Sequence, residues 1–133
     1  FDVDGYLATL HRVIERDHDV LAPRFHRDLE EPIAGAIRIA TGTELVITEG
    51  NYLLLRQDGW SRVAALLDES WMLCPNDGAR RERLTARHMA HGRNADDAHR
   101  WVLAVDEPNA ALILRDSAPA GFVFDPDDPA RAR

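Results

Sequence analysis

The sequence of 133 residues contains no lysine, and all sixteen of its basic residues are arginine. Chemistry that needs an amine, such as a Schiff base or a lysine in a phosphate-binding glycine loop, is therefore excluded within these residues. Cysteine is almost absent as well, since Cys74 is the single one and cannot form an intramolecular disulfide. A lone thiol favours a reducing compartment, so the sequence predicts a cytoplasmic protein.

Long hydrophobic runs are also missing. No apolar stretch approaches the roughly 18 residues of a membrane span, and the start FDVDG lacks the basic and apolar regions of a signal peptide. Acidic residues outnumber basic ones by 23 to 16, which gives a net charge of −7. Such a field repels phosphate backbones and anionic lipids, so we expect neither a nucleic acid nor a membrane as partner. The start at Phe1 indicates a piece of a longer protein.

Several catalytic motifs do not occur. There is no G-x-x-x-x-G-K-[ST] or G-x-G-x-x-G phosphate loop, and no serine lies in a G-x-S-x-G setting. The histidines His88, His91 and His99 lack the H-E-x-x-H pattern or cysteine pair that completes a zinc site. A metal-dependent hydrolase that uses these histidines remains an alternative.

Apolar spacing and capping residues predict one α/β domain over residues 1–124 and a frayed, charged tail over 125–133. Helices are expected at 2–17, 60–67, 77–91, 94–105 and 108–113, and strands at 45–47, 70–74 and 121–124. The prolines and glycines of the stretch 18–43 predict an ordered surface connection with at most a short strand. Helices that alternate with buried strands favour α/β layers with a mainly parallel sheet.

Glu49 follows the apolar run at 45–47, which has the character of a strand buried on both faces of a parallel sheet. Ligands of open α/β sheets bind at the carboxyl ends of such strands. Glu49, followed by Gly50, can therefore hold a magnesium-bound water or a substrate hydroxyl. The alternative is an ordinary surface acid at a strand end.

Arginines recur along the helix expected at 77–91. Arg80, Arg83 and Arg87 share one face at the spacing i, i+3, i+7 and can converge on a phosphate group. The alternative is a solvated face with ordinary ion pairs. The segment PRFHR at 23–27 offers an aromatic ring, a histidine and two arginines, and predicts either the wall of a substrate pocket or a turn with scattered charge.

Four segments together resemble one known family. They read FDVDGYLATLHRV at 1–13, APRFHRDLEEPIAGAI at 22–37, VITEGNYLLL at 46–55, and RRERLTARHMAHG at 80–92 followed by DEPNAALI at 106–113. In this order they are similar to the nucleoside and pantothenate kinase-like P-loop kinases, the relatives of uridine kinase, pantothenate kinase and phosphoribulokinase. The resemblance implies a three-layer α/β P-loop kinase fold that uses ATP and Mg²⁺ to phosphorylate a hydroxyl group of a small metabolite.

The resemblance also implies roles for individual residues. Glu49 matches the acid near magnesium and the acceptor, and Arg83 and Arg87 match the arginines of a lid helix. The remaining matches are the acceptor-pocket residues Pro23, Phe25, Arg27, Asn51 and Tyr52, and the nucleotide-side residues Asp106 and Asn109 of a D-x-P-N element.

Two departures from the family pattern limit what these residues can do. The family's first strand and phosphate loop precede the part that matches here, so we expect the chain alone to be inactive. His26 stands where relatives carry aspartate, which leaves the acceptor open among a nucleoside, a pantothenate-like compound and a sugar. The alternative function is a non-catalytic α/β module that binds an anionic metabolite or a partner chain, with an uncovered sheet edge near Val46 that invites pairing. A small-molecule substrate and a second copy of the chain, in a homodimer, are the partners considered.

Overall fold

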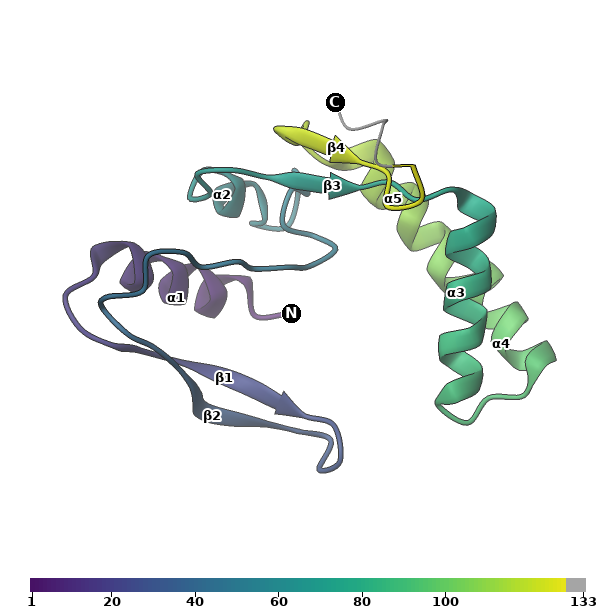
Figure 1. Cartoon of the computed structure of the whole chain (residues 1–133), viewed down its shortest axis with the longest axis horizontal. Helices are drawn as coiled ribbons and strands as arrows, with labels where there is room; N and C mark the ends of the chain where they lie inside the picture. Colours follow the sequence, from purple (N-terminus) through teal and green to yellow (C-terminus); the bar gives the residue numbers. More distant parts are fainter. Residues whose placement is uncertain (129–133) are drawn as a thin grey trace. The chain divides into compact units, whose positions relative to one another are not determined.

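The structure is a computed structural model and describes residues 1–128. The chain divides into two compact units, Phe1–Gly50 and Asn51–Arg133. The first unit holds one helix followed by two strands, and the second holds two short strands separated by a run of helices, in the order that Figure 1 shows. Each unit is described separately below.

The first unit begins with helix α1, Val3–Glu15. Asp2 caps it, because its Oδ1 accepts a hydrogen bond of 2.8 Å from the backbone N–H of Gly5. The helix buries Leu7, and Tyr6 reaches the Thr48 hydroxyl at 2.6 Å. The helix predicted at 2–17 is thereby confirmed.

Strands β1, Val20–His26, and β2, Glu31–Ile39, form an antiparallel hairpin in which Val20 pairs with Ile39 and His26 with Glu31 (Figure 1). The irregular connection predicted over 18–43 is therefore wrong. Pro23 and Gly35, which suggested breaks, lie where the pairing register shifts, and Gly35 has a φ of +65°. Proline has no N–H for the ladder and glycine adopts positive φ freely, so the bulge accommodates both inside a hairpin.

Residues 45–47 do not form the buried parallel strand predicted from their apolar run. Leu45 is 74% and Ile47 is 84% exposed, and no strand among residues 1–128 pairs with this segment. A run of apolar residues becomes a buried strand only where neighbouring strands receive its N–H and C=O groups. The expectation that Glu49 ends a parallel strand is wrong for the same reason.

The second unit contains the parallel pair β3, Trp71–Leu73, and β4, Phe122–Phe124, in which Trp71 lies opposite Phe122. The strands predicted at 70–74 and 121–124 are thus confirmed. The burial predicted for the strand at 70–74 is wrong, because Trp71 and Leu73 are each 62% exposed. Short helix α2, Ser61–Ala64, precedes them and buries Val63 completely.

Helix α3, Asp77–Ala90, is capped at its N-terminus by Asn76, whose Oδ1 accepts a hydrogen bond of 2.9 Å from the N–H of Gly78. It ends before Gly92, which has a φ of +95° as a helix stop requires. Asn94 then caps α4, Ala95–Trp101. These capping residues confirm the helix boundaries expected from the sequence.

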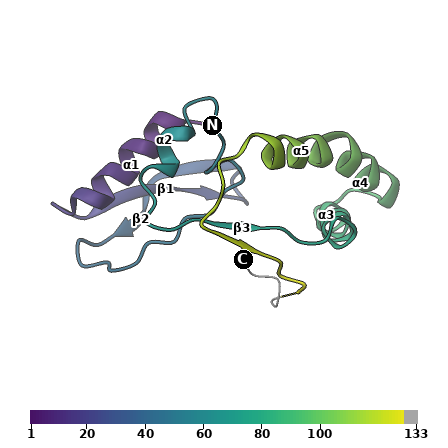
Figure 2. The ribbon, with the colours of Figure 1, turned by 90° about the horizontal axis from the view of Figure 1, so that it is seen from above.

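Helix α4 continues without a break through the π-helix η1, Val102–Asp106, into α5, Glu107–Asp116, and Figure 2 shows the run as one helical rod. The helices expected at 94–105 and 108–113 are therefore joined. Pro108 lacks an N–H to donate, and the widened π turn before it is an irregularity that accommodates this loss.

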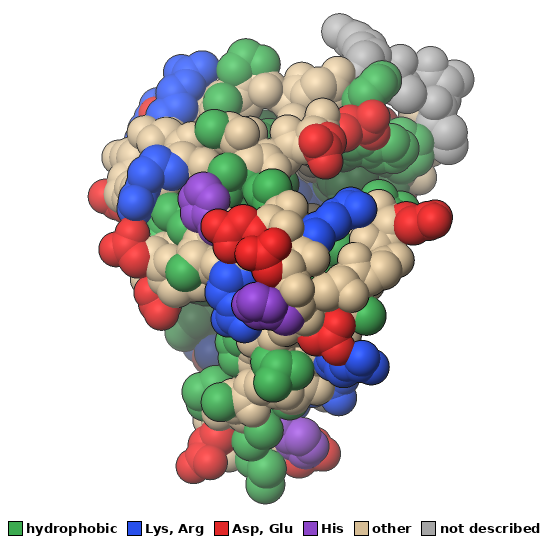
Figure 3. Space-filling model, turned by 90° about the vertical axis from the view of Figure 1, so that its left-hand side faces the viewer, with side chains coloured by type: hydrophobic (Ala, Val, Ile, Leu, Met, Phe, Trp, Pro, Cys, Tyr) green, Lys and Arg blue, Asp and Glu red, His purple; other side chains and the backbone are tan. Residues whose placement is uncertain are grey.

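The most buried apolar side chains of the second unit are Leu54, Leu55, Val63, Ala98 and Val102. Many other apolar side chains lie at the surface among charged ones, as Figure 3 shows for one face. Within residues 1–128 no helix has both the length and the apolar character needed to cross a membrane.

Candidate functional site

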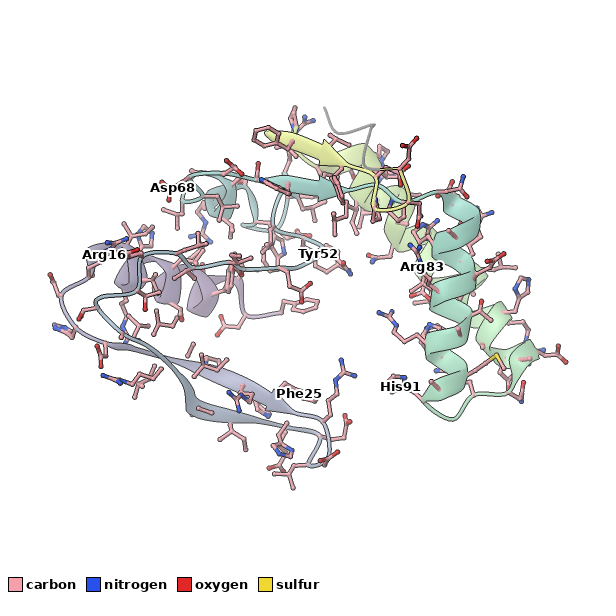
Figure 4. All side chains as sticks on the ribbon, in the orientation of Figure 1. Arg16, Phe25, Tyr52, Asp68, Arg83 and His91 are labelled. Carbon is pink, nitrogen blue, oxygen red and sulfur yellow. The ribbon has the colours of Figure 1, made fainter. Side chains whose placement is uncertain are left out.

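The residues predicted to wall an acceptor pocket lie on the β1–β2 hairpin. Pro23 and Phe25 belong to β1, and Arg27 lies in the turn that follows. Phe25 is 56% exposed and is labelled near the end of β1 in Figure 4. The hairpin thus presents an exposed aromatic ring and, two residues further along the sequence, an exposed arginine.

Glu49 belongs to the last residues of the first unit and Asn51 is the first residue of the second. Both side chains are exposed, and the Glu49 carboxylate has no hydrogen bond or ion pair to any residue in the described range 1–128. A solvated, unpaired carboxylate of this kind can accept hydrogen bonds from a metal-bound water.

Tyr52 and Asn109 are brought together although they are 57 positions apart. The Tyr52 hydroxyl donates a hydrogen bond of 2.7 Å to Oδ1 of Asn109, and the Tyr52 ring lies 5.9 Å from that of Trp60. The structure therefore joins two residues to which the resemblance gave different roles, Tyr52 in the acceptor pocket and Asn109 on the nucleotide side.

The first arginine of the α3 face belongs to an ion-pair network. Arg80 contacts Glu107 at 2.5 Å and Asp77 at 3.1 Å, and Arg81 contacts the other oxygen of Glu107 at 2.6 Å. The hydrogen bond from Arg81, followed by that from Arg80, lowers the pKa of Glu107 below its usual value. This network ties the first half of α3 to the start of α5.

Arg83 and Arg87 differ in their surroundings. Arg83, labelled in Figure 4, donates from both terminal nitrogens to the carboxylate of Asp127, with a distance of 3.3 Å from Nη1. The Arg87 side chain is exposed, and its guanidinium group has no partner among the residues that the structure describes. Of the three predicted arginines, Arg87 is the one whose donors are available to a ligand.

His88 and Asp106 form a pair that the sequence did not predict. Nε2 of His88 lies 2.8 Å from Oδ2 of Asp106, and the two side chains are only 18% and 21% exposed. The His88 ring also meets the Trp101 ring edge-on, with centroids 6.3 Å apart. No spacing rule links positions 88 and 106. The only hint in the sequence that Asp106 matters was its place in the D-x-P-N element, which does not point to His88 as its partner.

The remaining polar clusters are sparse. Across residues 1–128, no group of three or more His, Cys, Asp or Glu side chains is arranged to hold a metal ion. An open groove of about 390 Å³ lies along α3 and α4, lined by Arg81, Glu82, Thr85, Ala86, Met89 and His99. Apart from His99, which was named for the hydrolase alternative, none of the site residues predicted from the sequence lines it.

Comparison with known proteins places the chain among kinase-like proteins. It is 35% identical over 126 residues to the ATP-dependent kinase-like protein notR' of Aspergillus versicolor, and the match covers 90% of this chain and 73% of that protein. No family model matches the chain.

Two solved structures are similar to this one. The crystal structure of a candidate fructose transport system kinase from Silicibacter sp. TM1040 has a TM-score of 0.84 and 31% identity, over 93% of this chain and 60% of that one. YFH7 of Saccharomyces cerevisiae, a candidate P-loop kinase with a circular permutation, has a TM-score of 0.69 and 23% identity, over 79% of this chain and 34% of that one. The second likeness concerns the fold alone.

Proposed function

Because the chain belongs to the family of ATP-dependent P-loop kinase-like proteins, we propose that the complete protein transfers a phosphoryl group from ATP to a hydroxyl group of a small metabolite. Relatives are named for different acceptors, as a candidate uridine kinase of Schizosaccharomyces pombe and a candidate fructose transport system kinase of Silicibacter sp. TM1040. The residues of this chain supply the lid and the acceptor wall of that reaction.

The observation that carries the proposal is the arginine pair on α3. Arg83 and Arg87 lie one turn apart on the same helix, and the Arg87 guanidinium is exposed and unpaired among residues 1–128. Guanidinium groups bind phosphate oxygens through two parallel hydrogen bonds, and catalysis of phosphoryl transfer depends mainly on positioning and on stabilising the charge of the transferring group. An arginine held on a helix meets both needs.

The other site residues fit the same reaction. The unpaired carboxylate of Glu49 suits a water bound to Mg²⁺, which would offset charge on the transferring phosphate. Acceptor contacts fall to the exposed residues Pro23, Phe25, Arg27 and Asn51 and to Tyr52, and nucleotide contacts to Asp106 and Asn109. The 133 residues contain no lysine and no glycine-rich phosphate loop, so the triphosphate cradle of the reaction is not among them.

The test is phosphoryl transfer by the full-length protein with Mg²⁺ and ATP. Nucleosides, pantothenate-like compounds and sugars are offered separately, and ADP formation is measured for each. We expect one class to support turnover above the background of ATP hydrolysis. If no class does so, the kinase proposal is wrong and the binding-module alternative takes its place.

The role of Arg87 is tested in the same assay. Arg87→Ala should lower kcat about 10³-fold, because the charge on the transferring group loses its clamp. Thermal stability should stay close to that of the wild type, since the side chain is exposed. Arg100→Ala on α4 is the matched control, as it removes only an exposed ion pair with Asp97. Normal turnover by Arg87→Ala would show that this arginine does not act on the phosphate.

A further inference from the structure

The last turn of α3 is held by contacts that none of the roles above uses. His88 lies in this turn next to Arg87, and its Nε2 is 2.8 Å from Oδ2 of Asp106. An ionised carboxylate only accepts hydrogen bonds, so the histidine donates from Nε2. Both side chains are about four-fifths buried, which shields the pair from solvent competition.

Further contacts converge on the same turn. Nδ1 of His91 donates to the backbone carbonyl of Arg87 at 2.7 Å, and the N–H of Arg93 donates to the carbonyl of His88 at 3.2 Å. The guanidinium of Arg93 lies 3.9 Å above the ring of Trp101, and that ring meets His88 from the other helix. The helix end that carries Arg87 is thus fixed on several sides.

Asp106 belongs to the π-helix. Asp106 is the last residue of η1, and Glu107 is the first of α5. These neighbouring carboxylates reach different parts of α3, because Glu107 binds Arg80 and Arg81 while Asp106 binds His88 two turns further on. Single π turns inside α-helices occur frequently at functional sites, and here the turn supplies the second of two anchors for α3.

We propose that His88 and Asp106 are positioning residues, which fix the last turn of α3 so that the Arg87 guanidinium is oriented toward the transferring phosphoryl group. This inference rests on the proposed kinase function. Asp106 acts through His88, in place of the nucleotide contact suggested for it above, and Arg87 makes the contact with phosphate. The Arg87 guanidinium is unpaired among the described residues, but the helix turn that carries it is fixed. This arrangement is expected when the rate of phosphoryl transfer depends on how the positive charge is oriented as well as on its presence.

The inference predicts a particular kinetic signature. His88→Ala should lower kcat by about 10- to 100-fold, the effect of misplacing a catalytic group by about 1 Å. KM for the acceptor should change little, since no acceptor contact is assigned to His88. His88→Gln should restore much of the lost kcat, because its side-chain amide can still donate to Asp106.

A double-mutant cycle in the full-length protein separates positioning from general stability. Without the Arg87 guanidinium there is nothing left to orient, so His88→Ala should cause almost no further loss of kcat in the Arg87→Ala background. Hydrogen–deuterium exchange of the amides at 87–91 is followed in the same variants, and His88→Ala should speed it. Arg100→Ala should leave both kcat and exchange as in the wild type.

The outcomes distinguish the two proposals. If the wild type is active and His88→Ala either turns over normally or lowers kcat by the same factor in both backgrounds, the positioning role is overturned while the kinase function stands. If the wild type transfers no phosphoryl group, the function fails and the catalytic role of the pair fails with it. Unchanged exchange at 87–91 in His88→Ala would overturn the anchoring of the turn whatever the activity.

Discussion

Three arginines on one face of α3 have different environments in this protein. Arg80 is committed to Glu107, Arg83 to Asp127, and Arg87 has no partner among residues 1–128. The Arg83 and Asp127 side chains are 58% and 31% exposed, and exposed pairs of this kind contribute little to stability because solvent screens them. A phosphate group can therefore displace Asp127 at little cost, which keeps Arg83 compatible with the proposed lid role.

At the scale of one residue, Tyr52→Phe tests the bond that joins two predicted site residues. The change removes the hydroxyl that donates to Asn109 and leaves the ring against Trp60 in place. We expect the free energy of unfolding to fall by about 1 kcal/mol, as for a typical intramolecular hydrogen bond, in urea denaturation. In an Asn109→Ala background the same substitution should cost almost nothing. Equal costs in both backgrounds would mean that the two side chains are not energetically coupled.

The β1–β2 hairpin shows how an element accommodates residues that break regular strands. Pro23 and Gly35 lie at the register shift, and Leu21 is the nearest neighbour of an added Cβ at Gly35, 3.7 Å away. This is ordinary van der Waals contact, so space does not limit the position. The φ of +65° does.

Gly35→Ala should therefore destabilise the hairpin by about 1 kcal/mol through backbone strain alone. The measurement is the free energy of unfolding by urea. Gly42→Ala is the matched control, because nothing lies within 4 Å of its added Cβ and its φ is not in the left-handed region. Similar stabilities for the two alanine variants would show that the bulge tolerates a side chain and that its conformation differs from the one described.

The anchoring of α3 on α5 makes this pair of helices sensitive to acid. Arg81 and Arg80 lower the pKa of Glu107, so its contribution to stability is present above the ordinary glutamate pKa of about 4.3 and is lost as the pH falls through the lowered value. Glu107→Gln should thus be less stable than the wild type near neutral pH, and the difference should shrink below about pH 4. Urea midpoints measured across this range test the prediction.

Glu82→Gln serves as the control for that measurement. Glu82 lies on the same helix, and its carboxylate has no ion pair among the described residues. Its pH profile of stability should follow the wild type. A Glu107→Gln profile parallel to that of the wild type would contradict a stabilising role for the arginine pairs.

For the whole molecule, the α/β P-loop kinase fold predicted from the sequence is confirmed by the solved structures, with a TM-score of 0.84 over 93% of the chain for one of them. Parallel pairing occurs between β3 and β4, whereas β1 and β2 are antiparallel. Several large apolar side chains are exposed, among them Leu45, Ile47, Trp71, Leu73 and Phe122. Exposed apolar surface on strands and strand-like segments favours association.

We therefore expect the 133-residue chain, purified by itself, to self-associate and to bind Mg²⁺-ATP weakly. A triphosphate is normally held by backbone N–H groups of a glycine loop and a lysine, and this sequence contains neither. Light scattering measures the association and isothermal titration the binding. Tight, stoichiometric ATP binding by a stable monomer would contradict both expectations and reopen the alternatives to a kinase.

Local features of the sequence determined most of the helices. Asp2, Asn76 and Asn94 each cap a helix where expected, and Gly92 ends α3. These effects act over three or four residues, which is why a single sequence predicts them. The ordered motifs at 46–55 and 80–92 were likewise sufficient to indicate the kinase family.

Only the tertiary structure decided which side chains meet. The Tyr52–Asn109 and His88–Asp106 bonds join positions 57 and 18 residues apart, and no local pattern encodes them. The same holds for 45–47, where an apolar run predicted a buried strand but pairing and burial depend on neighbours elsewhere in the chain. Spacing along a helix places arginines on one face, whereas the carboxylates that approach from other elements determine which arginine stays free.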